Sequence, residues 1–182
     1  MTHVIGIDPS SKKIAICHTH NSNTYHYNIY LPEGVHPASG AAFREVFAFF
    51  KDFTGEGEFK DDGVVVYMEA PVVGRNAYST IVQAQVGGAI MAAVELSGIQ
   101  MFLVNVNSWK KYVIGKGNAT KPEVAEWLKE NWPDAYNSAG GDQDLLDASA
   151  INRYGYKRVR LTQAILLRRK KRGSRQGQKV SA

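Results

Sequence analysis

The most constraining feature of the sequence is a short apolar segment near the N-terminus that ends on a single carboxylate. Residues 3–8 read His-Val-Ile-Gly-Ile-Asp, and the Pro-Ser-Ser-Lys-Lys that follows has the composition of a turn. The chain then returns as a second apolar segment at 13–18. This pattern predicts two antiparallel β-strands, with Asp8 presented where the first one ends. A fold for this chain must therefore place a carboxylate at the edge of a sheet.

The remaining pattern predicts an α/β fold. Residues 24–31 alternate apolar with polar side chains, as a half-buried strand does. Residues 64–68 form a continuous apolar run, which is typical of a strand buried on both faces. A fifth strand is expected at 101–106. We expect helices at 39–53, at 77–97, after a cap at Asn107 or Ser108, after a cap at Thr120, at 142–154 and at 157–172. This order predicts a mixed five-stranded sheet with helices on both faces.

Charge is distributed unevenly along the chain. The segment from Lys157 to Ala182 contains ten of the 22 Lys and Arg residues and no Asp or Glu. The other 156 residues contain the remaining 12 basic side chains and all 17 acidic ones. An acidic body with a basic C-terminal segment indicates a polyanionic partner, and nucleic acid fits better than a membrane surface. A solubilising tail is the alternative that charge alone leaves open.

The bulk composition indicates one globular unit in a reducing compartment. A chain of 182 residues favours a single core, and no apolar run approaches the roughly 20 residues that span a bilayer. The N-terminus lacks the pattern of a signal peptide, and Cys17 is the single cysteine, so no internal disulfide can form. We therefore expect a cytoplasmic protein, with a folded domain at 1–156 and a basic helix and flexible tail at 157–182.

Four carboxylates are candidates for a shared site. Asp8 and Glu69 each end an apolar strand, at the edge where open α/β sheets place their ligands. Asp144 and Asp147 are three residues apart, so on a helix they point the same way. Close carboxylates repel one another, and a divalent cation relieves both this repulsion and the cost of burial. Oxygen donors favour Mg²⁺ or Mn²⁺ over zinc, and two such ions can promote phosphodiester hydrolysis.

Each of these features also has an ordinary structural interpretation. Asp8 fits a turn, Glu69 a strand end, and Asp144 or Asp147 the surface of a helix. Asp142 fits the cap or first turn of that helix. Gly87-Gly88 inside the helix at 77–97 lowers helix propensity, which indicates close approach of another backbone. That backbone could belong to the sheet of the same chain or to a second subunit.

Four blocks of sequence together resemble the RuvC-type Holliday-junction resolvases, which have a ribonuclease H-like fold. They occur in the family's order and with its approximate spacing, from residue 3 to about residue 155. The small size and the basic extension look like a phage-type member. The blocks are Ile5-Gly6-Ile7-Asp8-Pro9-Ser10-Ser11; Glu69 with Arg75-Asn76 and the helix through Gly87; Trp109-Lys110-Lys111 with Gly115-Lys116-Gly117-Asn118-Ala119-Thr120-Lys121; and Asp144-Leu145-Leu146-Asp147-Ala148.

The resemblance implies a homodimeric, Mg²⁺- or Mn²⁺-dependent crossover junction endodeoxyribonuclease of DNA recombination and repair, which nicks four-way junctions with two ions per active site. It assigns metal binding to Asp8, Glu69, Asp144 and Asp147, and a catalytic role also to Lys110 and Lys121. It places Arg75 and Asn76 near the DNA backbone. Charge adds Lys111, Lys116 and the C-terminal run Arg168, Arg169, Lys170, Lys171 and Arg172 as expected DNA contacts.

One departure and three alternatives accompany this resemblance. Members of the family often carry an aromatic residue three positions after the catalytic glutamate, and Val72 stands there in this chain. We therefore expect looser selectivity, with forks or flaps also cut. The alternatives are a YqgF-like ribonuclease H-fold nuclease acting on RNA, a non-catalytic junction-binding protein, and an actin-like or sugar-kinase-like ATPase. The last needs two such domains, for which 182 residues are too few.

Overall fold

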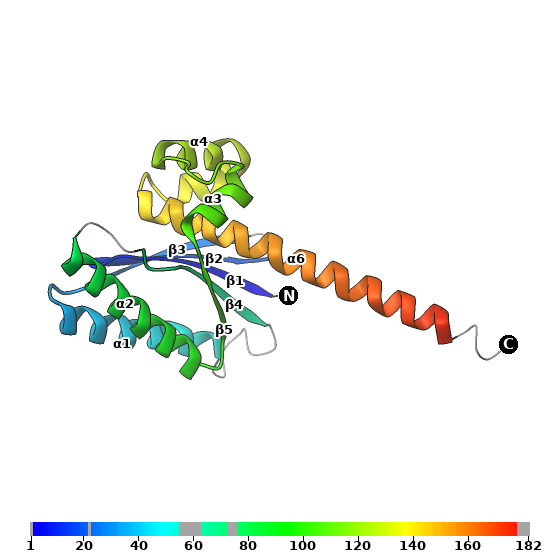
Figure 1. The fold of residues 1–182 in the computed structure, drawn as a ribbon, viewed down its shortest axis with the longest axis horizontal. Helices are drawn as coiled ribbons and strands as arrows, with labels where there is room; N and C mark the ends of the chain where they lie inside the picture. Colours follow the sequence, from blue (N-terminus) through cyan, green and yellow to red (C-terminus); the bar gives the residue numbers. More distant parts are fainter. Residues whose placement is uncertain (1, 22, 55–62, 73–75, 178–182) are drawn as a thin grey trace.

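A five-stranded mixed sheet forms the centre of the protein, in the order β3-β2-β1-β4-β5 (Figure 1). The computed structural model describes residues 2–21, 23–54, 63–72 and 76–177, and within these the side chains of all but residues 35, 52–54 and 166–177. The first three strands form an antiparallel meander, and the last two run parallel to β1. Both the α/β class and the mixed five-stranded sheet expected from the sequence are confirmed. The strands are β1 (His3–Pro9), β2 (Lys13–His20), β3 (Asn23–Tyr30), β4 (Val64–Glu69) and β5 (Gln100–Val104).

Helices cover both faces of the sheet (Figure 1). One face packs against α1 (Val35–Thr54) and α2 (Ala77–Leu96). The other face is crossed by the long helix α6 (Gln143–Gly177), whose C-terminal part extends well beyond the body of the protein. Three shorter helices pack beside α6 on this side: α3 (Val106–Ile114), α4 (Lys121–Asn131) and α5 (Pro133–Ser138).

Alternation along the strands sorts their side chains between the two faces. Ile5 and Ile7 of β1 point into the core with α1 and α2, whereas Val4 belongs to the core beneath α6. Gly6 lies against the backbone of α6. Because side chains alternate along a strand, Asp8 lies on the same face as Gly6. The parallel strand β4 repeats this arrangement, with Tyr67 in the core beneath α6 and Glu69 two residues further on.

Backbone contact and buried hydrogen bonds fix the position of α6 on the sheet. A Cβ atom built on Gly6 would lie 2.3 Å from the carbonyl oxygen of Ala148 and 2.4 Å from the backbone nitrogen of Asn152, so only glycine fits there. The fully buried Asn152 donates hydrogen bonds to the carbonyl oxygens of Val4, at 2.7 Å, and Cys17, at 3.0 Å. These contacts leave α6 little freedom to slide along the sheet.

Three details of the helices differ from the sequence-based expectation. The segments expected to form helices at 142–154 and 157–172 are one continuous helix, α6. Gly155 does not end it, because this glycine makes room for the ring of Tyr67 rather than providing a break. The cap of α3 is Asn105, not Asn107 or Ser108, since the side chain of Asn105 accepts the hydrogen bond from the Asn107 backbone nitrogen at 2.9 Å. The short helix α5 was not expected at all.

The two adjacent glycines of α2, Gly87 and Gly88, lie in different surroundings. A Cβ on Gly87 would meet the Pro71 side chain at 3.3 Å, so this glycine makes room for the segment of the same chain that follows β4. Gly88 has no such neighbour within 4 Å and faces outward. Among the described helices, α2 is long and apolar enough to span a bilayer by composition. One side of it packs into the core through Val82, Val86 and Ile90, as in the core helix of a globular protein.

Candidate active site

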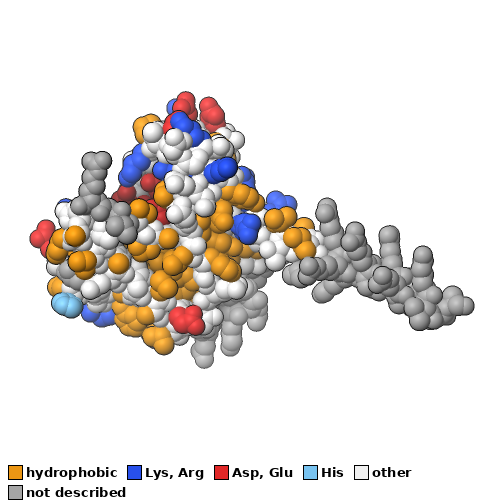
Figure 2. All heavy atoms as spheres, in the orientation of Figure 1, with side chains coloured by type: hydrophobic (Ala, Val, Ile, Leu, Met, Phe, Trp, Pro, Cys, Tyr) orange, Lys and Arg blue, Asp and Glu red, His pale blue; other side chains and the backbone are white. Residues whose placement is uncertain are grey.

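The four carboxylates singled out in the sequence line one pocket of about 270 Å³. Asp8 comes from the end of β1 and Glu69 from the end of β4, one register step beyond the last β1–β4 pair, Ile7 with Met68. Asp144 and Asp147 come from the first turns of α6. In Figure 2, one group of red acidic side chains lies recessed between the upper helices and the body of the protein, with blue basic side chains nearby. The fold thus gathers acids that are up to 139 positions apart in the sequence.

Asp8 is the carboxylate whose ionisation is most disfavoured. Burial raises its pKa well above the ordinary value, and the charges of Glu69, Asp147 and Asp144 raise it further. Burial likewise raises the pKa of Glu69 and of Asp147, although hydrogen bonds and nearby lysines counteract part of this effect. A site in which several buried carboxylates resist ionisation is one that a cation would stabilise.

Glu69 is held by a tryptophan rather than by a cation. The indole nitrogen of the fully buried Trp109 donates a 2.8 Å hydrogen bond to Oε2 of Glu69. Trp109 lies on α3, which follows directly after β5, the strand that pairs with β4. The second carboxylate oxygen, Oε1, is left for another partner in the pocket.

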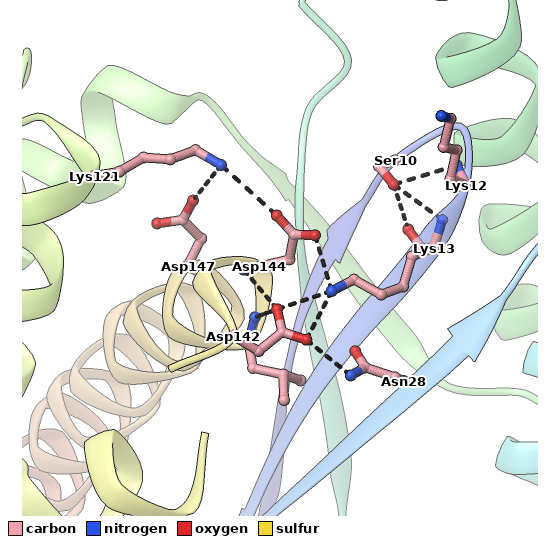
Figure 3. Close-up of polar contacts among 9 residues, drawn as sticks. Ser10, Lys12, Lys13, Asn28, Lys121, Asp142, Asp144 and Asp147 are labelled. Atoms are coloured by element: carbon pink, nitrogen blue, oxygen red, sulfur yellow. Dashed lines mark hydrogen bonds and ion pairs between the residues drawn. The ribbon is translucent and has the colours of Figure 1, made fainter. Parts of the chain in front are cut away.

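Two lysines approach the pair of acids on α6 (Figure 3). Lys121, the first residue of α4, lies 3.7 Å from Oδ1 of Asp144 and 4.0 Å from Oδ2 of Asp147, and its side chain is 60% exposed. Lys13 of β2 contacts Oδ2 of Asp144 at 3.0 Å. Gln143 donates a 3.3 Å hydrogen bond to Oδ1 of Asp147. Lys121, to which the resemblance assigns a catalytic role, therefore lies beside the acids of α6.

The other lysines expected near the site have different surroundings. Lys110 does not line the pocket: its ammonium group donates a 2.7 Å hydrogen bond to the carbonyl oxygen of Ala119 and lies over the ring of Trp109. Its charge nevertheless lowers the pKa of Glu69. Lys111 is exposed on α3. Lys116 is exposed but forms an ion pair with Glu123, at 2.5 Å.

Part of the expected DNA-binding set lies outside the residues or side chains that the structure describes. Arg75 belongs to the segment 73–75, and the described helix α6 includes positions 168–172 by backbone only. Asn76 caps α2, because its side-chain oxygen accepts a 3.2 Å hydrogen bond from the Ser79 backbone nitrogen. Val72 is 47% exposed and lines the pocket of the acids.

A larger hollow of about 740 Å³ lies near the opposite end of β1, where Val4 and the end of β2 contribute to its wall. It also contains Trp132, Arg153 and Arg160. Asp134 is the single acid among its lining residues, so it offers no converging carboxylates. The smaller acidic pocket is the better candidate for chemistry because perturbed titratable groups meet there.

Two residues of the site have no separate signal in the sequence. Lys13 sits in a turn-and-strand pattern that explains it without any site. Trp109 occurs in the third block of the resemblance without a role of its own, because it also fits the core of an amphipathic helix. Asp142 was assigned correctly as a helix cap, since its side chain accepts a 3.0 Å hydrogen bond from the Asp144 backbone nitrogen. Its second role, as a partner of Lys13 from 129 residues away, depends on tertiary contact.

Comparison with known proteins points to one family. No family model matches the sequence. The chain is 28% identical over 152 residues to the crossover junction endodeoxyribonuclease RuvC of Chlamydia caviae, covering 81% of this chain and 88% of that protein. It is 36% identical over 93 residues to RuvC of Chlorobium phaeovibrioides, a match that spans 50% of this chain and 47% of the relative.

Solved structures give the same answer for the fold. Thermus thermophilus RuvC superimposes with a TM-score of 0.67 at 19% identity, covering 88% of this chain and 96% of that one. The same protein in complex with Holliday junction substrate gives 0.68 at 17% identity, with the same coverage. The chain is a homologue of RuvC. The yeast mitochondrial Holliday junction resolvase Ydc2 shares the fold more distantly, with a TM-score of 0.52 at 12% identity over 84% of this chain and 76% of that one.

The homology to RuvC confirms the resemblance seen in the sequence and the ribonuclease H-like fold. The named RuvC relatives are bacterial, and the narrower expectation of a phage-type member stays a prediction. Among the described residues, no three His, Cys, Asp or Glu side chains stand in positions that would coordinate one ion without adjustment. In this RuvC homologue, Trp109 and the two lysines instead engage Glu69 and the acids of α6.

Proposed function

We propose that the protein is a divalent-metal-dependent endonuclease that nicks four-way DNA junctions, and other branched DNA, by phosphodiester hydrolysis. The observation that carries this proposal is the meeting of Asp8, Glu69, Asp144 and Asp147 in one pocket of a RuvC homologue. Two of the similar proteins are named as junction endonucleases or were solved with a Holliday junction. The intact set of four acids favours an enzyme over a purely DNA-binding protein.

The donor atoms of the pocket suit Mg²⁺ or Mn²⁺, two per active site, once the carboxylate side chains adjust to bind them. All four ligands would be hard carboxylate oxygens, and the raised pKa values of Asp8, Glu69 and Asp147 reflect negative charge that a cation would compensate. When bound, such ions activate a water and stabilise the charge that develops on the phosphate. We assign Asp8, Glu69, Asp144 and Asp147 as the residues that hold them.

The chain's own side chains would orient the acids and the phosphodiester. Trp109 fixes Glu69, and Gln143 fixes Asp147. Lys121 is exposed beside the acids, so its ammonium group can turn towards a phosphate oxygen and stabilise its charge. Lys110 contributes indirectly, because its hydrogen bond to the carbonyl oxygen of Ala119 supports the backbone two residues before Lys121.

DNA would approach across the acidic pocket and contact basic side chains around it. Lys111 is free to bind phosphate from its exposed position on α3, whereas Lys116 would first have to leave Glu123. Arg75, Asn76 and the C-terminal run Arg168, Arg169, Lys170, Lys171 and Arg172 remain proposed contacts. The domain boundary predicted from the sequence makes residues 157–182 a DNA-binding extension of a nuclease domain at 1–156. The affinity of these basic side chains for DNA should fall steeply as the salt concentration rises, as for any set of phosphate contacts.

A homodimer through α2 completes the proposal. Large apolar side chains lie exposed on its outer surface, among them Tyr78, Ile81, Met91 and Leu96, and Figure 2 shows hydrophobic side chains gathering over this part of the molecule. Gly88 on the same helix has open space beside it. Exposed apolar surface of this kind typically marks a protein interface.

A cytoplasmic location, which fits an enzyme acting on DNA, is part of the same proposal.

The decisive experiment is a nicking assay on junctions, forks, flaps, linear duplex and RNA, with and without Mg²⁺. Asp8→Asn and Asp147→Asn should each reduce the nicking rate by a factor of about 1,000 or more while junction binding persists. Asp134→Asn is the matched control, because this exposed acid lies on α5 outside the pocket. Wild-type rates in the two active-site variants would refute the assignment, and preferential cleavage of RNA would favour the YqgF-like alternative.

A further inference from the structure

A lysine outside the four-acid set is tied to one of the acids. The ammonium group of Lys13 lies 2.8 Å from both carboxylate oxygens of Asp142 and 3.0 Å from Oδ2 of Asp144 (Figure 3). Lys13 therefore joins a carboxylate that caps α6 to a carboxylate of the active site. The side chain is 15% exposed, against 60% for Lys121, so solvent does not readily replace these contacts.

Asp142 is itself held firmly, so it fixes the position of Lys13. Oδ1 of Asp142 accepts a 3.0 Å hydrogen bond from the Asp144 backbone nitrogen, which caps α6. Oδ2 accepts a 3.0 Å hydrogen bond from the side-chain amide of Asn28 on β3. The lysine is thus held between two strands and the first turn of a helix, in a way that a flexible surface ion pair is not.

The geometry of the pair is that of an ion pair in which both partners carry charge. The ammonium group of Lys13 lies within hydrogen-bond distance of both carboxylates, Asp142 and Asp144. A fixed positive charge and a fixed negative charge therefore stand beside Asp144.

We propose that Lys13, anchored by Asp142, is a positioning residue that holds Oδ2 of Asp144 and weakens the binding of a divalent cation to that carboxylate. The inference rests on the proposed metal-dependent function and adds a control of ion affinity to it. Lys13 occupies one oxygen of Asp144 and leaves Oδ1 facing the exposed, displaceable Lys121. An ion that uses Asp144 must therefore bind beside a fixed ammonium charge, which repels it.

The proposal predicts opposite changes in metal affinity when the charge of Lys13 or the charge of Asp142 is removed, and a purely structural role does not. Removing the charge of Lys13 leaves Asp142 uncompensated, so the pocket becomes more negative and should bind a cation more tightly. Removing the charge of Asp142 leaves Lys13 uncompensated, so the pocket should bind a cation more weakly. An ion pair that only stabilised the fold would change metal affinity in the same direction whichever partner was removed.

The test measures Mn²⁺ binding to the full-length protein without DNA, by electron paramagnetic resonance titration. Lys13→Met should tighten Mn²⁺ binding at Asp144 about tenfold and Asp142→Asn should weaken it about tenfold, as expected for one unit charge close to a divalent ion. Asparagine caps helices as well as aspartate does, so Asp142→Asn should preserve α6. The double variant should return towards the wild-type affinity. Lys12→Met, an exposed neighbour in the turn, should change nothing.

The possible outcomes separate this inference from the proposed function. If wild-type protein binds Mn²⁺ but both variants shift its affinity in the same direction, or neither does, the role of Lys13 is refuted and the metal site stands. If wild-type protein binds no Mn²⁺ at millimolar concentrations, the metal-dependent function itself is refuted. Thermal melting of each variant checks that a changed affinity does not arise from unfolding.

Discussion

The two faces of the sheet are held by different kinds of contact. Between the sheet and helices α1 and α2 lies an apolar cluster that includes Ile5 and Ile7 of β1 and Phe50 of α1. The contact between the sheet and α6 also involves Gly6 of β1, which lies against helix backbone, and the buried Asn152 of α6, which bonds to two strands. Apolar contacts tolerate small shifts, whereas hydrogen bonds and backbone contact do not. The face that needs accurate placement of acids is the one with the directional contacts.

This difference predicts that substitutions on the two faces of the sheet will have different effects on stability and on the nicking rate. A change on the α6 face should affect both stability and chemistry, because the first turns of α6 carry Asp144 and Asp147. A change on the α1–α2 face should affect stability with little effect on the rate per folded molecule. Four measurements test this contrast.

Gly6→Ala should have the largest effect. Its new Cβ would overlap the backbone of Ala148 and Asn152, so α6 must move away from β1. We expect a loss of more than about 3 kcal/mol in the free energy of unfolding and a nicking rate about 100-fold lower in the folded fraction. Gly40→Ala is the control on the other face, where the new Cβ meets only the flexible end of Arg44 at 3.4 Å. If Gly6→Ala is destabilised but nicks at the wild-type rate, α6 does not position the acids.

Phe50→Ala should be nearly as destabilising but should leave the chemistry intact. Phe50 of α1 is fully buried in the apolar cluster between the sheet, α1 and α2. Removing such a side chain costs about 3–5 kcal/mol, measured by urea denaturation. The nicking rate of the folded fraction should stay within about twofold of wild type. A large loss of rate would show that the apolar face also contributes to the geometry of the site.

Asp8→Asn should stabilise the metal-free protein. Because burial and neighbouring acids raise the folded-state pKa of Asp8 above its ordinary value of 3.8, its stabilising contribution is present below that pH and is lost as the pH rises through the raised pKa. At pH 7 with chelator we expect the variant to be about 1–2 kcal/mol more stable than wild type. The difference should shrink at acidic pH and on adding Mg²⁺, and thermal melting measures both. Equal stability at both pH values would contradict the raised pKa.

Trp109→Phe should have the smallest effect on stability, because the change acts mainly at the site. It removes the 2.8 Å hydrogen bond to Glu69 while keeping an aromatic ring in the core. Loss of one hydrogen bond to a charged group costs about 1.5–3 kcal/mol, so we expect a nicking rate reduced by about 10- to 100-fold at fixed Mg²⁺. Trp127→Phe, on α4 and outside the pocket lining, is the matched control. Equal rates in the two variants would mean that Trp109 does not orient Glu69.

The N-terminal segment at 3–8 shows how much of the site can be predicted from the local sequence pattern. A short apolar segment followed by turn residues put Asp8 at a strand end, and the continuous apolar run at 64–68 put Glu69 at another. The spacing of Asp144 and Asp147 placed them on one side of a helix. Local pattern failed at residues 155–156, because helices were expected at 142–154 and 157–172 and the structure has one continuous helix that includes Gly155. The role of Gly155, making room for Tyr67, depends on a contact between residues 88 positions apart.

The sequence by itself determined the strands, most of the helices and the four acids, because these depend on side-chain periodicity and on residue chemistry within a few positions. Only the tertiary structure decided that α6 crosses the sheet at Gly6, that Trp109 holds Glu69, and that Lys13 joins Asp142 to Asp144. These contacts join residues far apart in the chain, and packing rather than local propensity selects them. The carboxylate at the end of β1 became part of a site only when the fold brought its partners to it.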